Sequence, residues 1–328
     1  HMAEPALVAK SRTGREDEIC PCIGCNQGCA GHLQKDLAVT CLTNPRMGRE
    51  AEWPLPTDHR APSGKTRVAI VGAGPAGLEA AWVSAARGCT VTVFERDGEP
   101  GGQLRALDKM ARRREFLGLL DYQLAQCERY GVRLEYSRAV TVEDLPRDAY
   151  DRVLLATGSR PVPMSFESGT TARTLDDALT DPGQLGRHVA VYDTIGEWST
   201  LGAIEHFAEL GLEVTVVCPV PAFSWRTTIY STYANSRRLA AHPVRIRLLH
   251  RVLGLDNQGL RIEDLSTGES VHIDGVESLV AVQYNQARDE MYDALARQHD
   301  NVACVGDALA PRTALEAVFE GHEWALDL

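Results

Sequence analysis

The glycine-rich segment 72–77 (GAGPAG) constrains the fold more than any other part of the chain, because of what flanks it. Residues 68–71 (VAIV) form an apolar run typical of a buried strand in a parallel sheet, and a helix-forming segment follows to about residue 87. The three glycines have Gly-x-Gly-x-x-Gly spacing, and Glu95 ends the next apolar run, residues 91–94. Such glycines permit a tight turn that brings a pyrophosphate close to the start of the helix, while the acid accepts hydrogen bonds from a ribose. The pattern predicts a Rossmann-like, dinucleotide-binding α/β domain.

Composition and charge limit the class of protein. The chain has 328 residues, 44% of them hydrophobic, which is enough for two domains. A net charge of −11 argues against a nucleic-acid partner, and no apolar run approaches the roughly 18 residues of a membrane span. No signal peptide is visible, so we expect a cytoplasmic protein without membrane partners. The one local basic run, residues 112–114, is interpreted as a solvated helix face.

Five of the nine cysteines lie within the first 41 residues, and their spacing predicts a metal centre. Cys22, Cys25 and Cys29 occupy one short loop, and Cys41 follows after an eleven-residue gap. Structural zinc sites usually pair two Cys-x-x-Cys knuckles, whereas three thiolates from one loop and a distant fourth suit the corners of a cubane. We therefore predict a 4Fe-4S cluster, with zinc or no metal as alternatives. Cys20 is interpreted as a bystander, a redox-sensitive thiol or an alternate ligand.

A second strand–helix–strand pattern, residues 188–219, lacks the glycines of a nicotinamide site. Its turn, residues 193–198, reads DTIGEW. Asp193 and Glu197 place negative charge near an incoming pyrophosphate, and Trp198 obstructs close approach to the backbone. We expect a domain that keeps the fold while its NAD(P)H site has degenerated. An unusual but working site is the alternative.

Three further motifs favour a flavoprotein with two dinucleotide domains. They are GGQ at 101–103, ATG at 156–158 after an apolar strand, and VGD at 305–307 before a C-terminal helix. In proteins of this kind the last strand returns to the first domain, and its Asp meets the flavin near the ribityl and pyrophosphate groups. FAD is therefore favoured over ADP as the bound nucleotide.

Together, the cysteine segment CIGCNQGC with Cys41, the segment VAIVGAGPAGLEAA and the segment VGDALAPR resemble the trimethylamine dehydrogenase / 2,4-dienoyl-CoA reductase family of FMN, iron–sulfur oxidoreductases. The resemblance runs from about Glu4 to the C-terminus and implies Cys22, Cys25, Cys29 and Cys41 as cluster ligands. Where the family usually has Arg, this chain has Cys20. The expected nucleotide contacts are Gly72, Gly74, Pro75, Ala76, Gly77, Glu95, Arg96, Gly102, Gln103, Ala156, Thr157, Gly158, Gly306 and Asp307.

In that family a TIM barrel that binds FMN and substrate precedes the cluster. A barrel needs roughly 250 residues, and only about twenty precede the cysteines here. Residues 6–17, which follow shortly after Met2 in the sequence, match the family's segment after the last barrel strand. We expect the FMN and the substrate site on a separate barrel subunit, the alternative being a barrel removed from this chain.

The predicted organisation is α/β, with two Rossmann-like domains of the FAD/NAD(P) type. Residues 1–60 form the cluster module and a Pro-rich linker, residues 61–180 and 298–328 the FAD or ADP domain, and residues 181–297 an inserted degenerate NAD(P)H-type domain. The expected function is electron transfer between a barrel partner that oxidises a substrate such as a methylated amine and an acceptor such as an electron-transferring flavoprotein. The alternatives are an NAD(P)H-dependent reductase component feeding an enoate-reducing barrel, and a non-catalytic nucleotide-binding assembly subunit.

Overall fold

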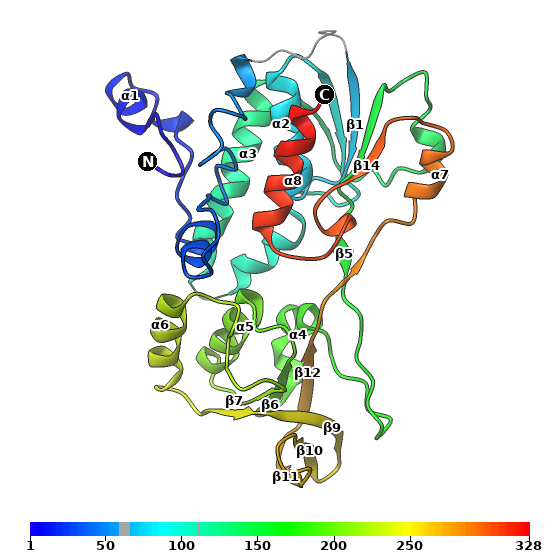
Figure 1. The fold of residues 1–328 in the computed structure, drawn as a ribbon. Helices are drawn as coiled ribbons and strands as arrows, with labels where there is room; N and C mark the ends of the chain where they lie inside the picture. Colours follow the sequence, from blue (N-terminus) through cyan, green and yellow to red (C-terminus); the bar gives the residue numbers. More distant parts are fainter. Residues whose placement is uncertain (59–65, 111) are drawn as a thin grey trace. The chain divides into compact units, whose positions relative to one another are not determined.

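The computed structural model describes residues 1–58, 66–110 and 112–328 (Figure 1). The chain forms two compact units, which are described separately. Unit 1 comprises residues 1–107, 114–160 and 286–328, and unit 2 comprises residues 108–113 and 161–285. The predicted linker lies partly, from residue 59, outside the described residues.

Unit 1 is built on a five-stranded sheet in which every neighbouring pair is parallel. The strand order is β14-β4-β1-β2-β3, so the predicted first strand is central. Residues 68–71 of β1 are buried, as the apolar run requires. The bounds are β1 Arg67–Val71, β2 Thr90–Phe94, β3 Arg133–Glu135, β4 Arg152–Leu155 and β14 Val302–Cys304; β5 (Ser159–Arg160) and β13 (Gln286–Ala287) form a separate antiparallel pair.

Helix α2 (Pro75–Ala86) follows β1 and packs against α3 (Leu117–Arg129) and α8 (Ala314–Leu326). Its residues 76–84 are all buried, so it is a core helix without a polar face. The approach to α8 is close, because a Cβ on Gly321 would lie 2.3 Å from the carbonyl oxygen of Ala76. The shorter elements of this unit are α1 Leu7–Arg12, η1 Glu16–Glu18, η2 Gln27–Gly31, η3 Pro56–Asp58, η5 Arg114–Phe116, η6 Val142–Asp144, α7 Tyr292–Ala296 and η8 Gly306–Ala308, and η4 Gly102–Lys109 begins in it.

Unit 2 contains a second parallel sheet, in the order β12-β6-β7-β8, and a three-stranded antiparallel sheet β11-β10-β9. The predicted strand–helix–strand pattern is present as β6, α5 and β7. The α/β, Rossmann-like prediction is confirmed. The bounds are α4 Leu175–Thr180, η7 Pro182–Leu185, β6 His188–Asp193, α5 Trp198–Glu209, β7 Glu213–Cys218, α6 Ile229–Leu239, β8 Val244–Leu248, β9 His250–Asp256, β10 Gly259–Asp264, β11 Ser270–Asp274 and β12 Ser278–Val282.

The units divide at 160/161 and 285/286, whereas the sequence analysis places domain boundaries at 180/181 and 297/298. The difference arises from pairings between residues far apart in the chain. Arg173 bridges to Val280, and α4 packs against β12 and α5, so residues 161–180 join unit 2. Helix α7 packs against β14 in unit 1.

The interpretation of residues 112–114 as a solvated helix face is wrong. Arg113 is buried, with its guanidinium 5.3 Å from the ring centroid of Trp198. Arg112 has a left-handed backbone (φ 55°) and pairs with Glu205 at 2.9 Å. A guanidinium can be buried against the face of an indole ring. A run of arginines in the sequence does not show whether this happens.

Replacing Gly321 by Ala is expected to destabilise unit 1 by about 1–3 kcal/mol, because the added methyl group clashes with the α2 backbone. The control is Gly118→Ala in α3, where a Cβ meets no atom closer than 3.6 Å. Urea unfolding of both variants checks this. Equal midpoints would contradict the tight α2–α8 contact.

Candidate functional site

The glycines of segment 72–77 serve two different purposes in the structure. Gly72 has φ +109°, and a Cβ there would lie 2.3 Å from the carbonyl oxygen of Ala156. A Cβ on Gly77 would lie 2.0 Å from the carbonyl oxygen of Gly72. Gly74, in contrast, has no atom within 4 Å of its Cβ position. The first and third glycines are therefore required by packing, while the second faces open space.

The turn leads into α2, whose N-terminus is not capped by a side chain. Gly74 is the N-cap residue and Pro75 begins the helix. The backbone N–H of Ala73 donates to Glu95 Oε2 at 2.7 Å, and that of Asp97 donates to Glu95 Oε1 at 2.9 Å. Glu95, buried beside the turn, thus supports the loop from within. The uncapped helix N-terminus presents backbone donors and a positive dipole end suited to an anion.

Three segments far apart in sequence meet at the carboxylate of Asp307. Its Oδ2 accepts hydrogen bonds from Ser159 Oγ at 2.7 Å and from Gln103 Nε2 at 2.9 Å. Its Oδ1 accepts from the backbone N–H of Arg312 at 3.0 Å. Gly306 precedes it with φ +61° and donates its N–H to Glu320 at 2.7 Å. Ser159 was not predicted, although it directly follows the ATG motif.

The other predicted nucleotide contacts lie in the turns after β1, β2 and β4 and at the starts of α2 and η4. Gly102 has φ +52°, and its Cβ position is 3.4 Å from Gly74 Cα. The hydroxyl of Thr157 donates to the carbonyl of Arg288, whose N–H donates to Gly158 at 2.9 Å. Arg96 is exposed and pairs with Asp97 at 3.6 Å. These segments follow the C-terminal ends of parallel strands, where α/β sheets bind ligands.

The cysteine segment folds back on itself around a π-helical turn, η2. Asn26, before the turn, is left-handed (φ 56°), as is Gly24 (φ 63°). The N–H of Thr40 donates to the carbonyl of Gly28 at 2.9 Å, and a Cβ on Gly28 would lie 2.9 Å from that threonine. This contact brings the chain before Cys41 against the turn that carries Cys29.

The four predicted ligand thiols form one electrostatic group. The pKa of Cys25 is raised to about 11, chiefly by burial and to a smaller extent by the nearby thiols of Cys41, Cys29 and Cys22. Cys22 is exposed, while Cys29 and Cys41 are partly exposed. Among the described residues, no three thiol, imidazole or carboxylate groups converge on one ion position.

The remaining cysteines are free thiols as well. Cys20 is 5% exposed and donates its thiol to the carbonyl of Thr43 at 3.2 Å. Burial strongly raises its pKa. Cys89, Cys127 and Cys218 are buried and Cys304 is half-buried.

The corresponding turn in unit 2 is filled by the protein's own side chains. Asp193 Oδ1 accepts from the N–H of Ile195 at 3.2 Å and of Gly196 at 2.9 Å. A Cβ on Gly196 would lie 2.4 Å from the ring of Trp225, which covers the turn. Glu197 pairs with Arg226 at 3.5 Å. The N–H groups of Ile195 and Gly196, in the turn before α5, are therefore engaged by Asp193.

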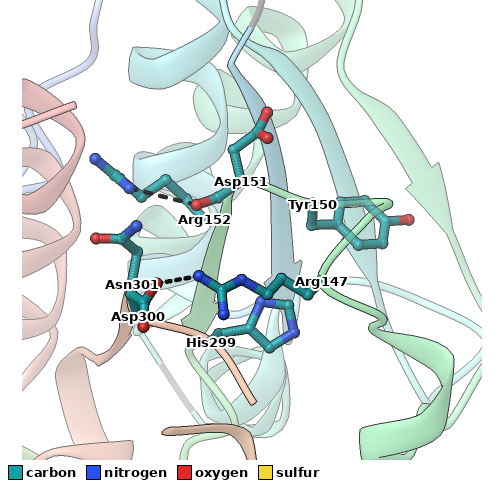
Figure 2. A pocket seen from close by; sticks show the side chains of 7 residues that line it. All are labelled: Arg147, Tyr150, Asp151, Arg152, His299, Asp300 and Asn301. Atoms are coloured by element: carbon teal, nitrogen blue, oxygen red, sulfur yellow. Dashed lines mark hydrogen bonds and ion pairs between the residues drawn. The ribbon is translucent and has the colours of Figure 1, made fainter.

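A polar pocket lies at the opposite edge of the unit 1 sheet, where β4 and β14 begin (Figure 2). An ion pair joins Arg147 and Asp300, and His299 Nε2 lies 2.6 Å from the carbonyl oxygen of Leu145. No predicted site residue lines this pocket. Its lining residues are Arg147, Tyr150, Asp151, Arg152, His299, Asp300 and Asn301.

The dinucleotide-type fold of this chain agrees with its similarity to known proteins. Residues 66–319 match the family model described as pyridine nucleotide-disulphide oxidoreductase. The chain belongs to that family. A redox role follows, and membership supports a flavin cofactor. Among the described residues, no helix has the length and apolarity needed to cross a membrane.

Relatives of this family member confirm the resemblance to the trimethylamine dehydrogenase / 2,4-dienoyl-CoA reductase family. A metal reductase of Desulforamulus reducens is 29% identical over 99% of this chain and 52% of the relative. A probable N-methylproline demethylase of Rhizobium meliloti is 30% identical over 79% of this chain and 38% of the relative. Histamine dehydrogenase from Rhizobium sp. 4-9 has a TM-score of 0.91 at 28% identity, covering all of this chain and 54% of that structure. The chain thus spans about half the length of these proteins, or less.

The stability of unit 2 is expected to fall as the pH rises above about 4. Burial raises the pKa of Asp193, although hydrogen bonds from Gly196, Ile195 and Thr200 lower it. The folded state then holds the proton more tightly than the unfolded state, so stability is full below the unfolded pKa and is lost as the pH rises through the folded one. In Asp193→Asn, the free energy of unfolding of unit 2 should change less with pH over this range.

Urea unfolding between pH 4 and 8 measures the effect. The control is Glu269→Gln, which removes an exposed carboxylate of the same unit. An unchanged slope in Asp193→Asn would show that this carboxyl does not titrate over the range.

Proposed function

We propose that this chain is the electron-transfer component of a flavin/iron–sulfur oxidoreductase. One observation carries the proposal: in unit 1 the cysteine segment packs on elements of the candidate nucleotide site. This site, called the nucleotide edge below, comprises Gly74, Glu95, Gln103, Ser159 and Asp307. Cys25, Ile23 and Leu42 share an apolar cluster with Leu104 of η4 and Val318 of α8. Gln103 lies on η4, and α8 closely follows Asp307. The two candidate redox sites are therefore held by shared structure.

In donor chemistry and sequence spacing, the cysteine segment fits a 4Fe-4S cluster held by Cys22, Cys25, Cys29 and Cys41, although these thiols do not converge on one ion position among the described residues. When bound, such a cluster supplies one-electron transfer. Gly24 and Gly28 let the backbone turn tightly, and the buried contacts of Ile23 and Leu42 exclude water from one side. Cys25 has a raised pKa without metal, so metal binding must displace its proton. Four thiols and no carboxylate suit iron and sulfide.

The nucleotide edge of unit 1 supports FAD. The uncapped start of α2 and the open space at Gly74 suit the pyrophosphate, and Glu95 lies beside the turn for the adenosine ribose. The polar group of Gln103, Ser159 and Asp307 offers partners for a ribityl chain, which ADP lacks. ADP is the alternative. It would use only the start of α2, Gly74 and Glu95.

The FMN and the substrate, a methylated amine, are assigned to a TIM-barrel partner or domain. Leu33 and Leu37 are 69% and 53% exposed in the cysteine segment, and Cys22 is exposed as well. An apolar surface beside a candidate redox centre suits a protein that must approach closely. The demethylase and the histamine dehydrogenase among the relatives favour amine oxidation.

Electrons are proposed to leave to an external acceptor, such as an electron-transferring flavoprotein, and not to NAD(P)⁺. Asp193 already accepts the N–H groups that would face a pyrophosphate, and Trp225 covers Gly196. The alternative is an NAD(P)H-dependent reductase, which the metal reductase among the relatives favours.

Anaerobic titration of the purified protein separates these directions. Addition of NADH should leave the flavin bands unchanged, because unit 2 offers no open turn, and dithionite should then bleach them. Bleaching by NADH would establish the reductase direction. A cluster spectrum without flavin bands would replace FAD by ADP.

Changing Cys22, Cys25, Cys29 or Cys41 singly to Ser should lower bound iron from about four per chain to near zero, because each thiol occupies one corner. The control is Cys89→Ser, which alters a buried thiol of unit 1 outside the cysteine segment. Iron and sulfide analysis after anaerobic reconstitution measures this. Full iron content in a Cys25 variant would remove that residue from the ligand set.

A further inference from the structure

Cys20 lies where the two ends of the cysteine segment come together. It is two residues before Cys22, and its partner Thr43 is two residues after Cys41. The thiol of Cys20 donates to the carbonyl oxygen of Thr43 at 3.2 Å, inside the protein. One hydrogen bond thus joins the chain entering the segment to the chain leaving it.

The backbone of Cys20 is held from the other side by Glu4. This buried carboxylate accepts the N–H of Cys20 at 3.2 Å and the N–H of Ala6 at 3.0 Å. Lys10 pairs with it at 2.5 Å and also donates to the carbonyl of Glu18 at 2.8 Å. The position of Cys20 is therefore fixed by the N-terminal segment and not only by its neighbours in sequence.

The segment between these two ends needs such a closure. Residues 22–41 form a loop of about twenty residues, and keeping the ends of a flexible loop together costs entropy that grows with its length. Thr43 also contacts the segment directly, since its Oγ1 lies 3.4 Å from Cys41 Sγ. A contact at the base of the loop therefore bears on how long Cys22 and Cys41 stay within reach of one cluster.

We propose that Cys20 is a positioning residue that closes the base of this loop and governs how firmly the loop retains its cluster, and that it is not a ligand. The inference rests on the proposed cluster. Its structural basis is the contact of the Cys20 Sγ with the carbonyl oxygen of Thr43 at 3.2 Å, which joins the two ends of the loop.

The chain supplies a matched control in Cys127. Its thiol is fully buried and donates to the carbonyl of Leu78 at 3.7 Å, within the core of α2 and α3. Cys127→Val removes a comparable buried thiol–carbonyl contact away from the loop. Cys20→Val removes the proposed closure, and Cys20→Ser keeps a donor.

The first measurement is the rate at which an iron chelator removes the cluster from reconstituted protein under anaerobic conditions. Cys20→Val should bind full iron but lose it about two- to tenfold faster than wild type, the range set by one net hydrogen bond. Cys20→Ser should recover part of the loss, and Cys127→Val should match wild type. Glu4→Gln should also lose iron faster than wild type, because it weakens the hydrogen bond that holds the backbone N–H of Cys20.

A second measurement does not need the cluster. Trypsin cleavage at the exposed Lys35 in metal-free protein reports how often the loop opens. Cleavage should be several-fold faster in Cys20→Val than in Cys127→Val.

Equal chelator and trypsin rates in Cys20→Val and Cys127→Val would overturn the closure. Loss of all iron in Cys20→Val, together with full iron in Cys22→Ser, would make Cys20 a ligand and also overturn it. Wild-type protein that binds no iron would instead refute the proposed function, and the trypsin comparison would then decide the closure alone.

Discussion

The nucleotide edge of unit 1 depends on one backbone contact, between the turn after β1 and the turn after β4. A Cβ on Gly72 would lie 2.3 Å from the Ala156 carbonyl oxygen, and one on Gly77 would lie 2.0 Å from that of Gly72. Any larger residue would push apart two strands whose interior is closely packed. The contact fixes where α2 begins, so the free helix N-terminus lies at the end of the sheet that also carries Asp307.

Unit 2 shows what the same strand–turn–helix arrangement becomes when the turn is filled from within. Its strand ends at Asp193, whose buried carboxylate takes the N–H groups of the turn, and Trp225 lies over Gly196. Unit 1 leaves the equivalent space open at Gly74. Since both turns follow the central part of a parallel sheet, the side chains around them, and not the fold, distinguish an open binding edge from a closed one.

The sequence predicts a dinucleotide turn after β1 because the signals for such a turn are local. Glycine spacing, an apolar strand and an acid at the end of the next strand are all properties of one short stretch of chain. Ser159 was not predicted because its contacts are with Gln103 on η4 and Asp307 on η8, which are far from it in the sequence. The burial of Arg113 was not predicted for the same reason, since Arg113 lies outside any helix and its partner Trp198 lies far along the chain in α5. The unit boundaries shifted because Arg173 pairs with Val280, far along the chain.

The sequence by itself determined the α/β class, the position of the dinucleotide turn and the grouping of cysteines that could share a metal centre, because each follows from residue type and short-range spacing. Only the tertiary structure decided which groups those residues face. It brought Cys20 against Thr43 and Trp225 over Gly196. It also directed the Glu95 carboxylate at the backbone N–H of Ala73, in the turn after β1. Contacts of this kind depend on how distant strands and helices pack, and the free energy of that packing is shared among many residues that no local pattern records.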